Sequence, residues 1–135
     1  MKTLFGGSEG VRTIIFPHTL KIVRQAAFCE IESLLKAVLN EGLETLGTDE
    51  LTLDGNLYLG VFQGSGLRSV VFPSTLKRVE YCAFAGCKNL KTVCLPNRLE
   101  YLGVGCFSET GLKSVKFPPS LRTISQDSFS WCKSL

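Results

Sequence analysis

A repeating pattern of apolar residues runs through most of this 135-residue chain and constrains its fold more than any other feature. Aligned on phenylalanine, residues 11–33 read VRTIIFPHTLKIVRQAAFCEIES and residues 67–89 read LRSVVFPSTLKRVEYCAFAGCKN. The period is 23 residues, with copies at 11–33, 35–66, 67–89, 90–111 and 112–134 and partial units at 1–10 and 135. A unit of this size cannot bury its own apolar face, so we expect the copies to stack into a solenoid that forms one domain.

Within the unit, apolar residues recur at positions 1, 4, 6, 10, 13 and 18. Position 18 is phenylalanine in every copy, and position 6 is phenylalanine in three copies; the residues are Phe28, Phe62, Phe84, Phe107 and Phe129, and then Phe16, Phe72 and Phe117. Phe5 fits the position 18 column in the partial unit at the start of the chain. The repeat therefore explains why the chain has nine phenylalanines but only one tryptophan and three tyrosines.

A short strand is expected at positions 3 to 6 of each copy, where residues alternate and positions 4 and 6 point inward. Position 4 is read as Ile14, Val38, Val70, Val93 and Val115. Proline at position 7 ends this strand in four copies, because it lacks a backbone donor. One such strand per turn of the solenoid predicts a parallel sheet along one side.

The spacing L-x-x-V-x-F-P-x-x-L, followed by L-x-x-I and x-x-A-F-x-x-C, resembles the BspA-like family of 23-residue leucine-rich repeats. The third copy carries the pattern at Leu67, Val70, Phe72, Pro73, Leu76, Val79, Ala83, Phe84 and Cys87. The resemblance implies a predominantly β member of the α/β-type solenoids, a right-handed superhelix with a concave parallel sheet. Its convex side is expected to consist of short strands, turns and 3-10 segments. The resemblance also implies a microbial cell-surface, periplasmic or secreted protein that uses its repeats for adhesion and binding.

The second copy departs most from the repeat. It has Asn40 and Glu41 at the end of its strand instead of proline, and an insertion at residues 47–61 delays its Phe62. Asp54 and Gly55 lie between alternating leucines, which predicts a projecting hairpin or extended loop. A bulge that packs on the convex side is the alternative. Among the insertion residues, Asp54, Gly55 and Tyr58 are candidate contacts; the acidic residues there match no calcium-binding loop, so no metal is expected.

Two outward-facing columns of the expected sheet are candidates for binding. Position 2 is basic in every copy, and position 5 is apolar in three copies; the residues are Arg12, Lys36, Arg68, Lys91 and Lys113, and then Ile15, Leu39 and Val71. Stacked like charges are mildly destabilising, and the basic column at position 2 suits an acidic protein surface or a polyanion. The alternative is that the long basic stems shield the sheet edge and keep the array soluble. The exposed apolar residues are the better indication of an interface.

Several classes of function are excluded by what the chain lacks. A net charge of +3 is too mild to indicate nucleic acid as a partner, and no apolar run reaches the roughly 20 residues of a membrane-spanning helix. Cys87 and Cys132 share the inward position 21, which favours buried thiols over disulfides. With His18 as the only histidine, neither a zinc site nor a nucleophile with its base is expected. The sequence therefore predicts no catalysis and no cofactor.

Three hypotheses of function remain. The leading one is a non-catalytic binding module whose concave face contacts a protein or other macromolecule, in protein–protein interaction or adhesion. A second is a hydrophobic small-ligand pocket near the insertion. The third is self-assembly into a homo-oligomer, because neither end of the array shows a polar capping unit and both ends are expected to expose strand edges.

Overall fold

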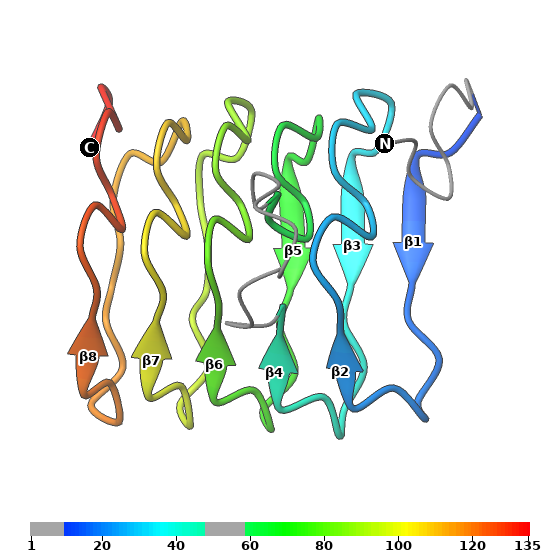
Figure 1. The fold of residues 1–135 in the computed structure, drawn as a ribbon, viewed down its shortest axis with the longest axis horizontal. Helices are drawn as coiled ribbons and strands as arrows, with labels where there is room; N and C mark the ends of the chain where they lie inside the picture. Colours follow the sequence, from blue (N-terminus) through cyan, green and yellow to red (C-terminus); the bar gives the residue numbers. More distant parts are fainter. Residues whose placement is uncertain (1–9, 48–58) are drawn as a thin grey trace, which may run out of the picture.

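The computed structural model describes residues 10–47 and 59–135, in which all strands belong to two parallel sheets (Figure 1). The first sheet contains β1 (Thr13–Ile15), β3 (Lys36–Val38) and β5 (Ser69–Val71) in that order. The second contains β2 (Ile22–Val23), β4 (Thr45–Leu46), β6 (Arg78–Val79), β7 (Tyr101–Leu102) and β8 (Thr123–Ile124). Within these ranges there is no helix, and turns occupy the places where 3-10 segments were implied.

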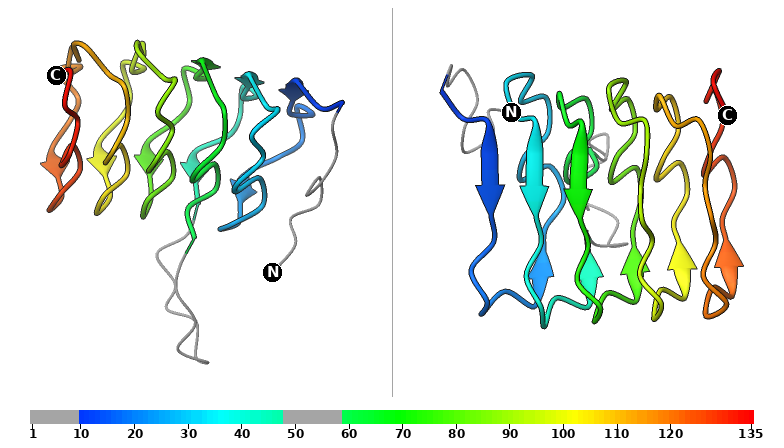
Figure 2. Two further views of the ribbon diagram at one scale, coloured as in Figure 1. Left: turned by 90° about the horizontal axis from the view of Figure 1, so that it is seen from above. Right: turned by 180° about the vertical axis from the view of Figure 1, so that it is seen from behind.

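Each repeat forms one coil of a solenoid. The strands of the first sheet all point one way and those of the second sheet point the opposite way (Figure 1), and the two sheets form opposite walls of the molecule (Figure 2). We number the coils 1 to 5, for residues 11–33, 34–66, 67–89, 90–111 and 112–134. The described part of the chain contains no helix that is long and apolar enough to cross a membrane.

The core lies between the two sheets and is built from the predicted columns. Leucines at positions 1, 10 and 13 of coils 2 to 4 and at position 1 of coil 5 are fully buried: Leu34, Leu43, Leu46, Leu67, Leu76, Leu90, Leu99, Leu102 and Leu112. Parallel pairing brings Ile14, Ala37 and Val70 into register, and these side chains point into the core while their strand neighbours are more exposed. Each coil thus buries its apolar residues against the next coil, as the repeat predicted.

Phenylalanine at position 18 forms a continuous stack through the core. The rings of Phe28, Phe62, Phe84, Phe107 and Phe129 follow one another at centroid distances of 5.5, 5.5, 5.2 and 5.6 Å. Their planes diverge by only 15° at the first contact and 5° at the last. This spacing is close to the ~4.8 Å separation of paired strands, so the repeat distance itself places the rings in contact.

Coil 2 begins one residue earlier than the sequence predicted. Ala37, not Val38, pairs with Ile14 and Val70, so Leu34 occupies position 1 and Leu35 occupies position 2. The two adjacent leucines left both frames compatible with the apolar pattern, and strand pairing selects the frame that buries Leu34 completely. Asn40 then takes the place of proline at position 7, and its Nδ2 donates to the Leu20 carbonyl of coil 1 at 2.9 Å.

The strand predicted at positions 3 to 6 forms at positions 3 to 5 of coils 1 to 3 and does not form in coils 4 and 5. In this described region, residues 92–94 and 114–116 are not assigned as strand. Position 5 is β-branched in the first three coils but is Cys94 and Lys116 in the last two. Lysine is disfavoured in strands, and neither residue stiffens the extended backbone as valine or isoleucine does.

All six cysteines are free, and position 21 uses its thiols as hydrogen-bond donors. The Sγ of Cys87 donates to the Phe62 carbonyl of the preceding coil at 3.2 Å, and the Sγ of Cys132 donates to the Phe107 carbonyl at 3.1 Å. Each thiol therefore links two coils as well as filling core volume, a polar role that the sequence analysis did not predict.

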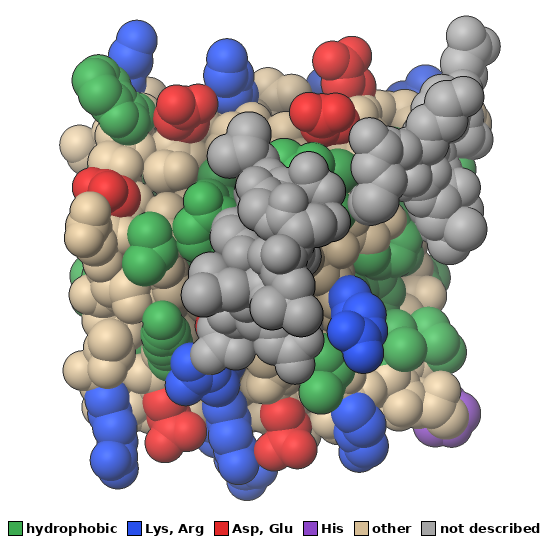
Figure 3. Space-filling view, in the orientation of Figure 1, with side chains coloured by type: hydrophobic (Ala, Val, Ile, Leu, Met, Phe, Trp, Pro, Cys, Tyr) green, Lys and Arg blue, Asp and Glu red, His purple; other side chains and the backbone are tan. Residues whose placement is uncertain are grey.

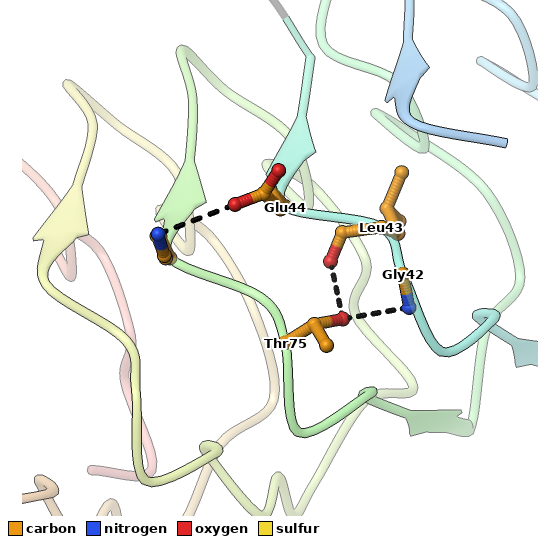
Figure 4. Close-up of polar contacts among 5 residues, drawn as sticks. Gly42, Leu43, Glu44 and Thr75 are labelled. Atoms are coloured by element: carbon orange, nitrogen blue, oxygen red, sulfur yellow. Dashed lines mark hydrogen bonds and ion pairs between the residues drawn. The ribbon is translucent and has the colours of Figure 1, made fainter.

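Adjacent coils are also joined by hydroxyl groups in the turns at the edge of the second sheet. The Oγ1 of Thr75 accepts from the Gly42 amide at 2.9 Å and donates to the Leu43 carbonyl at 2.8 Å (Figure 4). Ser120 repeats the second bond, because its Oγ donates to the Leu99 carbonyl at 2.7 Å. These bonds hold the turns of neighbouring coils in register.

Candidate interaction face

The exposed face formed by the first sheet and the adjoining segments of coils 4 and 5, which we call the first-sheet face, carries a row of five basic side chains. We call Arg12, Lys36, Arg68, Lys91 and Lys113 the basic row; all five are exposed. Four lie at position 2, as predicted, whereas Lys36 lies at position 3, where it pairs with Thr13 and Ser69. The ion pairs of the described residues involve none of these five side chains.

An apolar stripe lies next to the basic row. Ile15 is 72% exposed and Val71 is 47% exposed, as expected for position 5. The expectation that Leu39 lies exposed between them is wrong, because its side chain is 3% exposed and belongs to the core. Val38, half-buried and in register with Ile15 and Val71, takes that place. We define the apolar stripe as Ile15, Val38 and Val71.

The same face is hollowed where the strands of coils 4 and 5 are missing. A groove of about 590 Å³ is lined by Val93, Cys94, Leu95, Lys116, Phe117 and the two prolines that follow. Cys94 and Lys116 occupy position 5, so this groove lies in line with the apolar stripe. The sequence analysis did not predict the groove, because its cause is an absence of strand pairing between neighbouring coils.

The edge of the second sheet where its strands begin has a charge pattern very different from that of the basic row. Position 11 alternates in sign along the solenoid, as Lys21, Glu44, Lys77, Glu100 and Arg122, which we call the charge ladder. Lys77 Nζ lies 3.2 Å from Glu44 Oε1, and Arg122 Nε lies 4.0 Å from Glu100 Oε1. Alternating blue and red side chains mark this edge at the bottom of Figure 3. The signs were readable in the sequence, but only the coil register shows that these residues are neighbours.

A buried carboxylate lies on the second sheet beside this edge. Glu80 is 2% exposed, and its Oε1 lies 2.5 Å from the Arg78 Nε. The Arg78 guanidinium also lies 3.9 Å from the centre of the Tyr101 ring in the next coil. A buried carboxylate needs a charged or hydrogen-bonding partner, and Arg78 supplies it, so we assign Glu80 a structural role.

The remaining predicted site residues lie in segments that the structure does not describe. Asp54, Gly55 and Tyr58 of the insertion, and Phe5, lie outside the described residues. His18 is exposed in the turn between β1 and β2. Burial raises the pKa of the Cys87 thiol to about 11 and that of the Cys106 thiol to about 12, which keeps both protonated at neutral pH.

The repeat, the two parallel sheets and the inward leucines define a leucine-rich repeat solenoid. The chain matches the BspA type leucine-rich repeat region, in six copies, over residues 2–53 and 55–135. The chain therefore belongs to this family, and family membership makes it a repeat module of the protein-interaction type. No curated protein matches the chain.

The fold is shared by solved leucine-rich repeat structures. A leucine-rich repeat protein of T. pallidum superposes with a TM-score of 0.81 at 23% identity, over 93% of this chain and 56% of that one. A leucine-rich repeat protein from Bacteroides ovatus superposes with a TM-score of 0.74 at 20% identity, over 92% of this chain and 32% of that one. The present chain thus spans only about half and about a third of their lengths.

Proposed function

We propose that this chain is a non-catalytic module that binds another protein, in interaction or adhesion, through the first-sheet face. The observation that carries the proposal is the basic row, five exposed cations without an ion pair in the described residues, lying beside an exposed apolar stripe. Interfaces commonly combine an apolar centre with charged groups at the rim, where the charges speed association and select the partner.

Selection from a displayed library of random peptides tests this proposal. A variant carrying Arg68→Glu and Val71→Asp reverses one charge and removes one apolar contact on the proposed face. The matched control, Lys21→Glu with Ile22→Asp, likewise replaces one cation and one β-branched residue by acids, at exposed residues of the second sheet and its edge. Peptide recovery should fall about tenfold or more in the first variant and stay unchanged in the control. Equal recovery from both variants would remove the face from consideration.

Self-association is a second candidate function, favoured by apolar residues of coil 5 that are exposed in the described part of the chain. Phe117 is 45% exposed and Ile124 is 48% exposed, whereas the equivalent residues of coil 4, Leu95 and Leu102, are buried. β8 pairs with β7 alone, so the far edge of β8 is unpaired within the described residues. A second copy of the chain that packs on these residues would bury both the apolar side chains and the strand edge. The oligomeric state in solution tests this candidate.

A further inference from the structure

The two charged columns of the solenoid have the same coil-to-coil spacing but opposite organisation. The charge ladder alternates in sign, and two of its neighbours lie within ion-pair distance. The basic row has a single sign in all five coils, and its side chains form no ion pair among the described residues. Like charges on neighbouring strands are unfavourable, so the basic row carries a cost that an acidic partner would relieve.

The chemistry beside the basic row favours a polypeptide as that partner. The apolar stripe covers coils 1 to 3, and in coils 4 and 5 the groove beside the position 5 residues, Cys94 and Lys116, adds the apolar side chains of Val93, Leu95 and Phe117. A sulfated polysaccharide would satisfy the cations but would leave this apolar line without a counterpart. An acidic protein segment with an adjacent apolar face matches both rows.

The spacing of the two rows fits an α-helix laid across the coils. Paired strands lie ~4.8 Å apart, and one turn of helix rises ~5.4 Å, so successive helical turns meet successive coils. The basic row and the apolar stripe are two or three residues apart along each strand, about 7–10 Å. That separation matches two adjacent faces of a helix that is ~10–12 Å across.

We infer that the first-sheet face binds an amphipathic α-helix with an acidic stripe and an adjacent apolar stripe. The acidic stripe meets the basic row, the apolar stripe meets Ile15, Val38 and Val71, and one larger apolar side chain fills the groove between coils 4 and 5. The inference rests on the proposed function and specifies its partner. The apolar anchor in the groove is expected to supply much of the affinity, and the charges are expected to set orientation and association rate.

A synthetic peptide of about 14 residues, which as a helix spans the five coils, tests the inference. Its glutamates occupy one stripe at helical spacing and its leucines occupy the adjacent stripe. A permuted peptide of the same composition, in which neither residue type forms a stripe, is the control. Fluorescence anisotropy should show binding of the first peptide only, weakening as ionic strength rises from ~0.05 to ~0.5 M. Circular dichroism should show a gain of helix on binding.

Paired variants of the chain locate the binding surface. Arg68→Gln with Lys91→Gln removes two charges from the basic row, and Arg122→Gln with Lys21→Gln removes the same residue types from the charge ladder. Affinity should fall roughly tenfold in the first variant and less than twofold in the second. Thermal unfolding of both variants shows whether the fold is retained. Replacing the terminal leucine of the peptide by alanine tests the groove without altering the protein.

Three outcomes would overturn the inference. They are equal binding of the designed and permuted peptides, a bound peptide without helix, and binding that is unaffected by Arg68→Gln with Lys91→Gln. Tight binding of heparin through Arg68 and Lys91, with no binding of the peptide, would assign the face to sulfated polysaccharide instead. If peptides selected from the random library bind this face but the designed acidic helix does not, the inference fails while the proposed function stands.

Discussion

Cysteine is the residue whose role the structure changes most. Cys29, Cys87 and Cys106 are buried, Cys82 and Cys132 are partly buried, and Cys94 is exposed at the groove. Desolvation is the main cause that raises the pKa of Cys29, Cys82, Cys87 and Cys106. The thiolate is the reactive form, so these four thiols lose reactivity through their pKa, in addition to any steric protection.

Thiol labelling of the native chain should therefore be selective. We expect Ellman's reagent at pH 8 to modify Cys94 first, Cys82 and Cys132 more slowly, and the three buried thiols only on unfolding. Mass spectrometry of partially labelled protein identifies the modified residues. Cys94→Ser should abolish the fast phase, and a fast phase that persists in this variant would contradict the assignment. In denaturant, all six thiols should react with the reagent at one rate.

At the level of elements, the coil lengths have a simple structural cause. Coils 1, 3 and 5 have two residues between position 21 and the next leucine, whereas coils 2 and 4 have one, Gly66 or Gly111. The shorter connection draws the backbone onto the preceding coil. A β-carbon on Gly66 would lie 2.1 Å from the Glu32 carbonyl oxygen, and one on Gly111 would lie 2.3 Å from the Lys88 carbonyl oxygen. Only glycine permits this approach.

Gly111→Ala should therefore destabilise the solenoid, because the obstructing atom is backbone and cannot rotate away. We expect the free energy of unfolding to fall by about 1–3 kcal/mol, measured by urea denaturation. Gly10→Ala is the control, since a β-carbon at that position has no heavy atom within 4 Å. Equal stability of the two variants would show that the connection relaxes without cost.

At the level of the whole molecule, the exposed apolar residues of coil 5 favour pairing of two copies. Phe117 and Ile124 are each almost half exposed in the described part of the chain. Two copies that pack these residues against each other make a self-complementary contact, which closes as a dimer.

Sedimentation velocity over a range of concentrations tests this arrangement. We expect a monomer–dimer equilibrium without larger species, weakened at least tenfold by Ile124→Lys, which charges the exposed apolar layer. Val104→Lys, at an exposed site of coil 4, should leave the equilibrium unchanged. A monomer at every concentration would contradict self-association, and a continuing series of larger species would contradict the closed dimer.

Much of this architecture follows from local sequence alone. An apolar pattern with a 23-residue period predicts stacked repeats, because a single unit cannot bury its own apolar face. Stacking then brings equivalent positions of neighbouring repeats into contact. The phenylalanine stack from Phe28 to Phe129 and the buried leucines were predictable on that ground. The sequence also placed the basic residues of four coils at position 2, where the structure has them.

The interaction face depended on relations between coils, which a single repeat does not encode. Leu34 and Leu35 satisfied the apolar pattern equally, and pairing with β1 and β5 was needed to bury Leu39 and expose Val38. The groove results from strand pairing that coils 4 and 5 do not make. Periodicity therefore determined the stacked core, since burial acts on every repeat alike. Register between coils determined the surface, because the neighbour that a side chain faces belongs to another coil.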